Sequence, residues 1–177
     1  MYAPKGIGAL YVRRGVTLES QMHGAGHERG MRAGTENVPY IIGLGHAATV
    51  AAKSLASAGD HTAALRDRLE GQLREGIGEG LTVNAAKAER LPNTLSINFP
   101  GVSGAALLGR IPELCASTGA ACHSGSENLS PTLTAIGLTP QITRGTVRLS
   151  VGWYTTEEET DRAANLLLAA WESELSS

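Results

Sequence analysis

The sequence predicts an α/β fold of mixed strand order, and three observations lead to this prediction. Small and apolar residues recur at helical spacing between residues 38 and 76. Two segments, 94–99 and 146–151, alternate between apolar and polar residues, as half-buried strands do. A capping-box pattern near residue 156 then begins a last helix. From about residue 60 onward the predicted order is α-β-β-α-β-α-β-α, which is typical of a compact α/β unit.

The first elements surround a polar loop. The apolar run 6–12 contains two glycines, and we predict a buried strand there. Residues 24–37 are polar, glycine-rich and basic, which indicates a functional loop. Thr35 is a suitable N-cap for a helix over 38–55.

A pair of helix-breaking residues follows this helix. Gly59 and Asp60 are expected to interrupt or kink it, and a second helix is predicted over 61–76. The leucines of this second helix share one face, while its other face carries many charges. We interpret the charged face as exposed to solvent, with charge pairs four residues apart.

Further strands are predicted at 81–83, at 94–99, at 114–117 and at 146–151. The strand at 114–117 leads into a segment of small residues that contains Cys122. Three more helices have recognisable starts: Ser103 before 105–108, Ser130–Pro131, and Thr155 or Thr156 with Glu158 or Glu159 three residues later.

Composition excludes several classes of protein. The chain has 177 residues, a hydrophobic fraction of 42% and a formal net charge of −2, so it has no electrostatic footprint for nucleic acid or an anionic membrane. No apolar run approaches the roughly 20 residues of a membrane span, and no signal peptide pattern opens the chain. Two cysteines without a CxxC pair favour neither a disulfide framework nor zinc. We therefore expect a cytoplasmic protein.

Cys122 is the first candidate for chemistry. It lies among small residues in segment 117–126, directly before His123 and Ser124, so a proton acceptor and a hydrogen-bond donor are close to an accessible thiol. The alternative is an incidental cysteine in a Gly/Ser turn. Cys115 lies in the apolar strand predicted at 114–117, where we expect it to be buried and inert.

Two further candidates could bind anions. Thr35, at a predicted helix start with two arginines nearby, could bind a phosphate group; the alternative is an ordinary N-cap beside surface arginines. Arg148, in the middle of a strand, binds a carboxylate either of the fold or of a ligand. His23 and His27 have no fitting metal-ligand partners, so no metal site is predicted.

Four motifs resemble those of a known family. Residues 2–11 (YAPKGIGALY) are similar to the Y-G-P-K-G-I-G-A-L-Y segment of the cysteine desulfurases, which are fold-type-I pyridoxal-phosphate enzymes of aminotransferase class V. Residues 27–37 resemble their G-x-E-R-G-x-R-x-G-T-x-N loop. Residues 119–124 resemble their catalytic-cysteine loop, and 148–152 their R-x-S-x-G strand. The form of the cysteine loop is also similar to that of selenocysteine lyase.

The resemblance implies the C-terminal portion of a fold-type-I pyridoxal-phosphate-dependent transferase. Residues 1–58 would be the end of the large cofactor-binding domain, and 59–177 the small α/β domain that carries the cysteine loop. The lysine that forms the Schiff base in this family would precede Met1, and Lys5 matches a different lysine of the motif. The chain by itself is therefore expected to be inactive, whether it is a truncation or is completed by another chain.

The resemblance also implies a reaction and its residues. The family converts L-cysteine to L-alanine and leaves a persulfide, here on Cys122, whose sulfur is donated to iron–sulfur cluster or thio-cofactor assembly. Arg148 would bind the substrate carboxylate, and Thr35 would reach the phosphate of pyridoxal 5'-phosphate across a homodimer interface, with His27 as a secondary candidate. A sulfur acceptor or an iron–sulfur scaffold protein would be the partner. The alternatives are a selenocysteine lyase acting on L-selenocysteine, and a non-catalytic fragment or interaction module.

Overall fold

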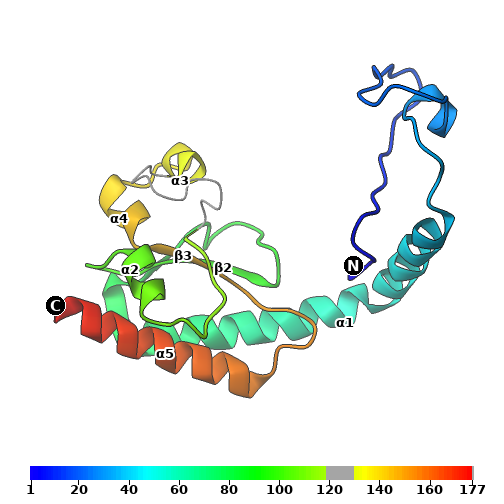
Figure 1. Cartoon of the computed structure of the whole chain (residues 1–177). Helices are drawn as coiled ribbons and strands as arrows, with labels where there is room; N and C mark the ends of the chain where they lie inside the picture. Colours follow the sequence, from blue (N-terminus) through cyan, green and yellow to red (C-terminus); the bar gives the residue numbers. More distant parts are fainter. Residues whose placement is uncertain (119–129, 177) are drawn as a thin grey trace. The chain divides into compact units, whose positions relative to one another are not determined.

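The computed structural model describes residues 1–118 and 130–176 of the chain. Its backbone divides into two compact units, Met1–Ala56 and Ser57–Ser177 (Figure 1). The long helix α1 (Val38–Ile77) begins in the first unit and ends in the second. The second unit holds the β-sheet and all of the buried core residues.

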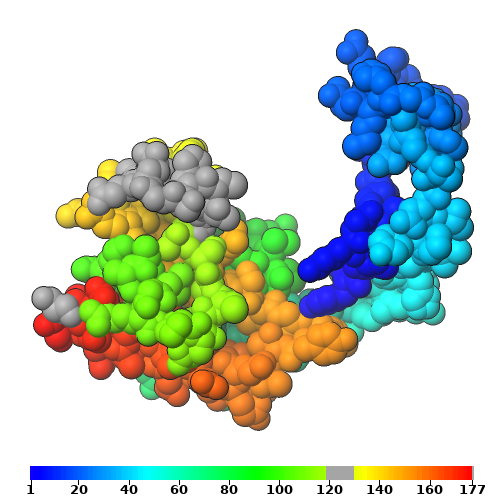
Figure 2. All heavy atoms as spheres, in the orientation of Figure 1, coloured from blue at the N-terminus to red at the C-terminus, as the bar shows by residue number. Residues whose placement is uncertain are grey.

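The first unit has no buried residue, and the blue and cyan side chains of Figure 2 illustrate this exposure. It contains the short 3-10 helix η1 (Glu28–Gly30) and the start of α1. The buried strand predicted at 6–12 is wrong: this segment has no strand, and Leu10 and Tyr11 are 78% and 85% exposed. A strand needs a neighbour to accept its ladder hydrogen bonds, and no described segment pairs with residues 6–12.

Helix α1 is continuous, so the predicted break at Gly59–Asp60 is wrong. A glycine inside a helix costs only about 1 kcal/mol relative to alanine, and tertiary packing exceeds that cost. Just beyond the glycine, the hydroxyl of Thr62 donates to the carbonyl of Ala58 at 2.7 Å, and the leucines at 65, 69 and 73 are buried. The start of the helix also differs from the prediction. The cap is Asn37, whose side-chain oxygen accepts from the Tyr40 N–H at 3.3 Å, and not Thr35.

The sheet has three antiparallel strands in the order β1 (Thr82–Val83), β2 (Thr94–Asn98) and β3 (Thr146–Ser150). The register places Ser96 of β2 opposite Arg148 of β3. All three strands lie where the sequence predicts them.

The strand predicted at 114–117 is wrong. Only Ser117 pairs with the sheet, through an isolated bridge to Arg148. Leu114 donates its N–H at 3.1 Å to the carbonyl of Ile111, which closes a turn in place of a ladder. Cys115, predicted to be buried, is consequently exposed.

One face of the sheet carries the core. Leu95 and Ile97 of β2 and Val147 and Leu149 of β3 alternate onto this face and pack with leucines of α1, α2 (Gly104–Gly109) and α5 (Glu157–Leu175). Figure 1 shows α1 and α5 running side by side along it. The opposite face of the same strands is polar, which follows from the period of two along each strand.

Side-chain caps begin three helices of the second unit, whereas Ser103, at the predicted start of α2, makes no capping hydrogen bond with its side chain. In α3 (Pro131–Ala135) the Ser130 hydroxyl accepts from the Leu133 N–H, and α5 begins with the predicted capping box, formed by Thr156 and Glu159. Helix α4 (Pro140–Arg144) was not predicted. Its signal is the same as that of α3, a hydroxyl residue followed by proline, here Thr139–Pro140.

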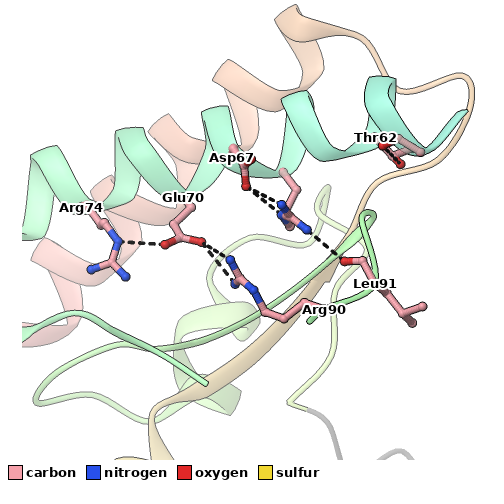
Figure 3. Close-up of polar contacts among 8 residues, drawn as sticks. Thr62, Asp67, Glu70, Arg74, Arg90 and Leu91 are labelled. Atoms are coloured by element: carbon pink, nitrogen blue, oxygen red, sulfur yellow. Dashed lines mark hydrogen bonds and ion pairs between the residues drawn. The ribbon is translucent and has the colours of Figure 1, made fainter. Parts of the chain in front are cut away.

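Charged residues of α1 hold the segment before β2 against the helix (Figure 3). Glu70 accepts from Arg74 at 2.9 Å, four residues along the helix, and from both terminal nitrogens of Arg90 at 3.4 Å. Arg66 donates to the carbonyl oxygen of Leu91 at 3.0 Å. The charged helix face thus positions the residues that lead into β2, in addition to facing solvent.

Another ion pair joins α1 to α5, and it should make the stability of the fold depend on pH. Arg68 donates to both carboxylate oxygens of Asp161, at 2.6 and 2.8 Å, and Gln72 donates to the same carboxylate at 2.6 Å. The Arg68 hydrogen bonds, followed by that of Gln72, lower the pKa of Asp161 to about 2. Because the pKa is lowered in the folded state, the Asp161 carboxylate stabilises the fold at pH values above its unfolded pKa of roughly 3.9. This stabilisation is lost as the pH falls toward the folded-state pKa of about 2.

We therefore expect Asp161→Asn to remove part of the acid sensitivity. The urea midpoint of the wild-type chain should fall between about pH 5 and pH 2 more steeply than that of the variant. Glu79→Gln is the control, because Glu79 forms no ion pair within the described residues. Parallel curves for wild type and Asp161→Asn would contradict the prediction.

Candidate functional site

Arg148 lies in the middle of β3, on the polar face of the sheet. Its strand alternates, so that Val147 and Leu149 are buried while Arg148 and Ser150 are exposed. Strand β2 lies on one side of Arg148, and on the other side Ser117 exchanges two backbone hydrogen bonds with it, at 2.7 and 3.3 Å. Within residues 1–118 and 130–176, the Arg148 guanidinium forms no ion pair. A guanidinium on a strand that is paired on both sides, with no carboxylate partner among these residues, is suited to binding a ligand carboxylate.

A buried amide and hydroxyl network continues this polar face. Asn84, Asn98 and Thr146 are 7%, 4% and 1% exposed. The two asparagine amides bind each other reciprocally at 3.1 and 2.8 Å, and the Thr146 hydroxyl donates to Asn98 at 2.6 Å. Asn98 also donates to Thr82 at 2.9 Å, and Asn84 to the hydroxyl of Ser96 at 2.9 Å. Sequence reasoning missed this network, although the polar positions of β2 alternate with its apolar ones and could have indicated it.

The loop around Thr35 is exposed and is organised by an ion pair. His27 Nδ1 lies 3.0 Å from each carboxylate oxygen of Glu36. A hydrogen bond from the backbone N–H of Glu36, and after it the His27 contact, lower the pKa of the Glu36 carboxyl. Gly34 has a φ of +100°, a backbone conformation that favours glycine, so the turn before Thr35 depends on this residue. Thr35 and His27 thus belong to one loop, and this loop and Arg148 lie in different units of the chain.

The structure describes one of the two cysteines, Cys115. Cys122 lies outside the described residues. Cys115 is exposed and lines a cavity of about 380 Å³ beside α5, together with Glu113, Arg162 and the polar end of β3. Cys115 is therefore an accessible thiol.

Among the described residues, no helix is long and apolar enough to cross a membrane. No group of three or more histidine, cysteine, aspartate or glutamate side chains in that part of the chain is placed to hold a metal ion.

Comparisons with known proteins identify the family. The family model of the class-V aminotransferases matches residues 1–163. Two curated cysteine desulfurases named IscS are similar: that of Aeromonas salmonicida is 43% identical over 169 residues, covering 94% of this chain and 41% of the relative. That of an Anaeromyxobacter species is 44% identical over 170 residues, covering 95% of this chain and 42% of the relative.

A solved structure agrees with the sequence comparisons. A NifS-like protein has 34% sequence identity and a TM-score of 0.78, over 98% of this chain and 43% of that protein. The chain spans about two fifths of the length of the curated relatives it matches. The predicted α/β fold and the predicted family are both confirmed: the chain belongs to the class-V aminotransferase family.

Proposed function

We propose that this chain carries the carboxylate-binding and sulfur-accepting groups of a cysteine desulfurase. The observation that carries the proposal is Arg148: its backbone is paired with neighbouring segments on both sides, and its exposed guanidinium pairs with no described carboxylate. Ser117, the backbone partner of Arg148, precedes Cys122 by only five positions in the sequence. The candidate thiol and the candidate carboxylate site are therefore separated by a short stretch of sequence that begins at the strand partner of Arg148. The relatives named cysteine desulfurase support the same reaction class.

The family cofactor, pyridoxal 5'-phosphate, requires more than these residues supply. Its Schiff base needs a positioned lysine, but Lys5, Lys53 and Lys87 are all exposed. Neither the cavity beside α5, of about 380 Å³, nor one of about 670 Å³ between β2 and α4 is lined by a lysine. The described residues therefore do not by themselves fit the cofactor.

The roles of this chain's own residues follow from their chemistry. The guanidinium of Arg148 binds the α-carboxylate of L-cysteine with two parallel hydrogen bonds. The thiolate of Cys122 attacks the substrate sulfur, so that an S–S bond forms while the bond between the substrate Cβ and sulfur breaks. Cleavage of that carbon–sulfur bond would require an electron sink, which the family cofactor would supply in the complete enzyme, and protonation of the carbon gives the methyl group of alanine. The second sulfur remains on Cys122 as a persulfide for an acceptor.

The loop of the first unit has a separate proposed role. We assign Thr35 to the cofactor phosphate of a neighbouring subunit in a homodimer, because its hydroxyl lies in an exposed loop with arginines at 29 and 32. His27 is the secondary candidate, and its Nδ1 is already used by Glu36.

A chimeric enzyme tests the proposal. The segment of the Aeromonas salmonicida cysteine desulfurase that matches this chain is replaced by residues 1–177, and alanine formation from L-cysteine is measured with the sulfur bound to protein. We expect one alanine for each sulfur transferred, and a mass increase of one sulfur atom on the peptide that contains Cys122. A folded chimera that holds its cofactor and produces no alanine would overturn the proposal. Turnover of L-selenocysteine alone would assign the chain to the lyase activity instead.

A further inference from the structure

A row of polar residues crosses the sheet at Arg148. Ser96 of β2 is the partner of Arg148 in the strand register. Asn84, which follows β1, donates its backbone N–H to the carbonyl of Ser96 at 2.9 Å and so continues the pairing beyond Val83. Directly opposite residues of antiparallel strands face the same side, with Cβ atoms about 4.5–5.5 Å apart. Ser96 and Arg148 are therefore immediate neighbours on the polar face.

The buried network fixes the direction of the Asn84 amide. The side-chain oxygen of Asn98 accepts from the Asn84 amide at 3.1 Å and from the Thr146 hydroxyl at 2.6 Å. The Asn98 amide nitrogen in turn donates to the Asn84 oxygen at 2.8 Å. One N–H of Asn84 is occupied by Asn98, and the other points to the Ser96 hydroxyl oxygen at 2.9 Å. This arrangement uses the Ser96 oxygen as an acceptor.

The Ser96 hydroxyl has no acceptor for its own proton among the described residues. A serine hydroxyl has one proton to donate, and Ser96 donates it to no acceptor within the described residues. An arginine side chain has donors only, so Arg148 cannot accept it. Two neighbouring groups thus present N–H and O–H donors, and that part of the chain supplies no acceptor for them. A carboxylate, which is anionic and accepts several hydrogen bonds, satisfies both.

We propose that Ser96 is a second donor to the substrate carboxylate, beside Arg148, and that Asn84 is the positioning residue that orients its hydroxyl. The inference rests on the proposed function, because the carboxylate is that of the amino-acid substrate. The site selects for ligands that carry a carboxylate next to the reacting centre. Asn84 acts through Ser96 and does not touch the substrate.

The first test uses the full 177-residue chain with acetate as the probe. Acetate is titrated while the Arg148 guanidinium N–H and the Ser96 amide are followed by NMR. We expect both signals to shift, and we expect Ser96→Ala to weaken acetate binding roughly tenfold, as for a lost hydrogen bond to a charged group. Ser96→Thr, which keeps the hydroxyl, should restore the wild-type affinity. Equal affinity in wild type and Ser96→Ala, or no shift at Arg148, would overturn the proposal.

The second test uses the chimera and a split between KM and kcat. Ser96→Ala should raise KM for L-cysteine roughly tenfold with little change in kcat, since the lost contact is made before and during the reaction alike. Ser103→Ala is the matched control: Ser103 makes no capping hydrogen bond with its side chain and is not a member of the row. An unchanged KM in Ser96→Ala overturns the assignment of Ser96. A chimera inactive even with wild-type residues overturns the proposed function instead, and the acetate titration still decides the role of Ser96.

Discussion

Replacing Cys122 by serine in the chimera should reduce alanine formation by at least about a thousandfold, the scale on which removal of a catalytic nucleophile acts. Serine keeps the size of the side chain, but its neutral hydroxyl is a far weaker nucleophile toward sulfur than a thiolate. The host portion of the chimera should still hold the cofactor, and the substrate carboxylate should still bind, because Arg148 is unchanged. The measurement is a single-turnover assay of alanine together with the mass of the Cys122 peptide.

Cys115→Ser is the matched control for this experiment. Cys115 is exposed, so an accessible thiol remains in Cys122→Ser and is removed in Cys115→Ser. We expect Cys115→Ser to retain alanine formation and to carry the extra sulfur on Cys122. Loss of activity in Cys115→Ser with retention in Cys122→Ser would move the sulfur-accepting role to Cys115, beside α5.

Arg148→Ala should raise KM for L-cysteine by roughly 10- to 150-fold, which corresponds to about 1.5–3 kcal/mol for hydrogen bonds to a charged group. The reason is that the guanidinium has no carboxylate partner within the described residues, so its N–H donors are available to a ligand carboxylate. Arg148→Lys should recover only part of the loss, because an ammonium group cannot form two parallel hydrogen bonds with one carboxylate.

Stability measurements separate this role from a structural one. Because the side chain is exposed and forms no ion pair in the described part of the chain, the urea midpoint of Arg148→Ala should remain close to that of wild type. A large fall in the midpoint with an unchanged KM would show that Arg148 holds the fold together and would contradict the prediction.

Local rules predicted much of the second unit. Strands β2 and β3 follow from alternation alone, because a period of two places Leu95, Ile97, Val147 and Leu149 on one face. The start of α5 follows from Thr156 and Glu159, whose capping bonds lie within four residues of sequence. Such features require no distant part of the chain.

Elements that depend on distant partners were predicted poorly. The apolar run 6–12 has the composition of a strand, yet strand formation depends on a neighbouring strand that no described segment provides. Gly59 and Asp60 have weak helix propensity, yet the leucines that α1 buries beyond them keep the helix continuous. Cys115 was placed on a strand for its apolar neighbours, and a turn hydrogen bond from Leu114 overrides that preference.

The sequence by itself determined the α/β class, the family motifs and Arg148 as a carboxylate-binding candidate, because these depend on residue type and on short spacings. The tertiary structure decided which groups surround Arg148. Asn84, Ser96 and Arg148 lie 12 and 52 positions apart in the sequence, and only the register of the three strands aligns them in one row. Strand register joins residues across the sheet through backbone hydrogen bonds, and no local pattern in the chain specifies which residues will meet.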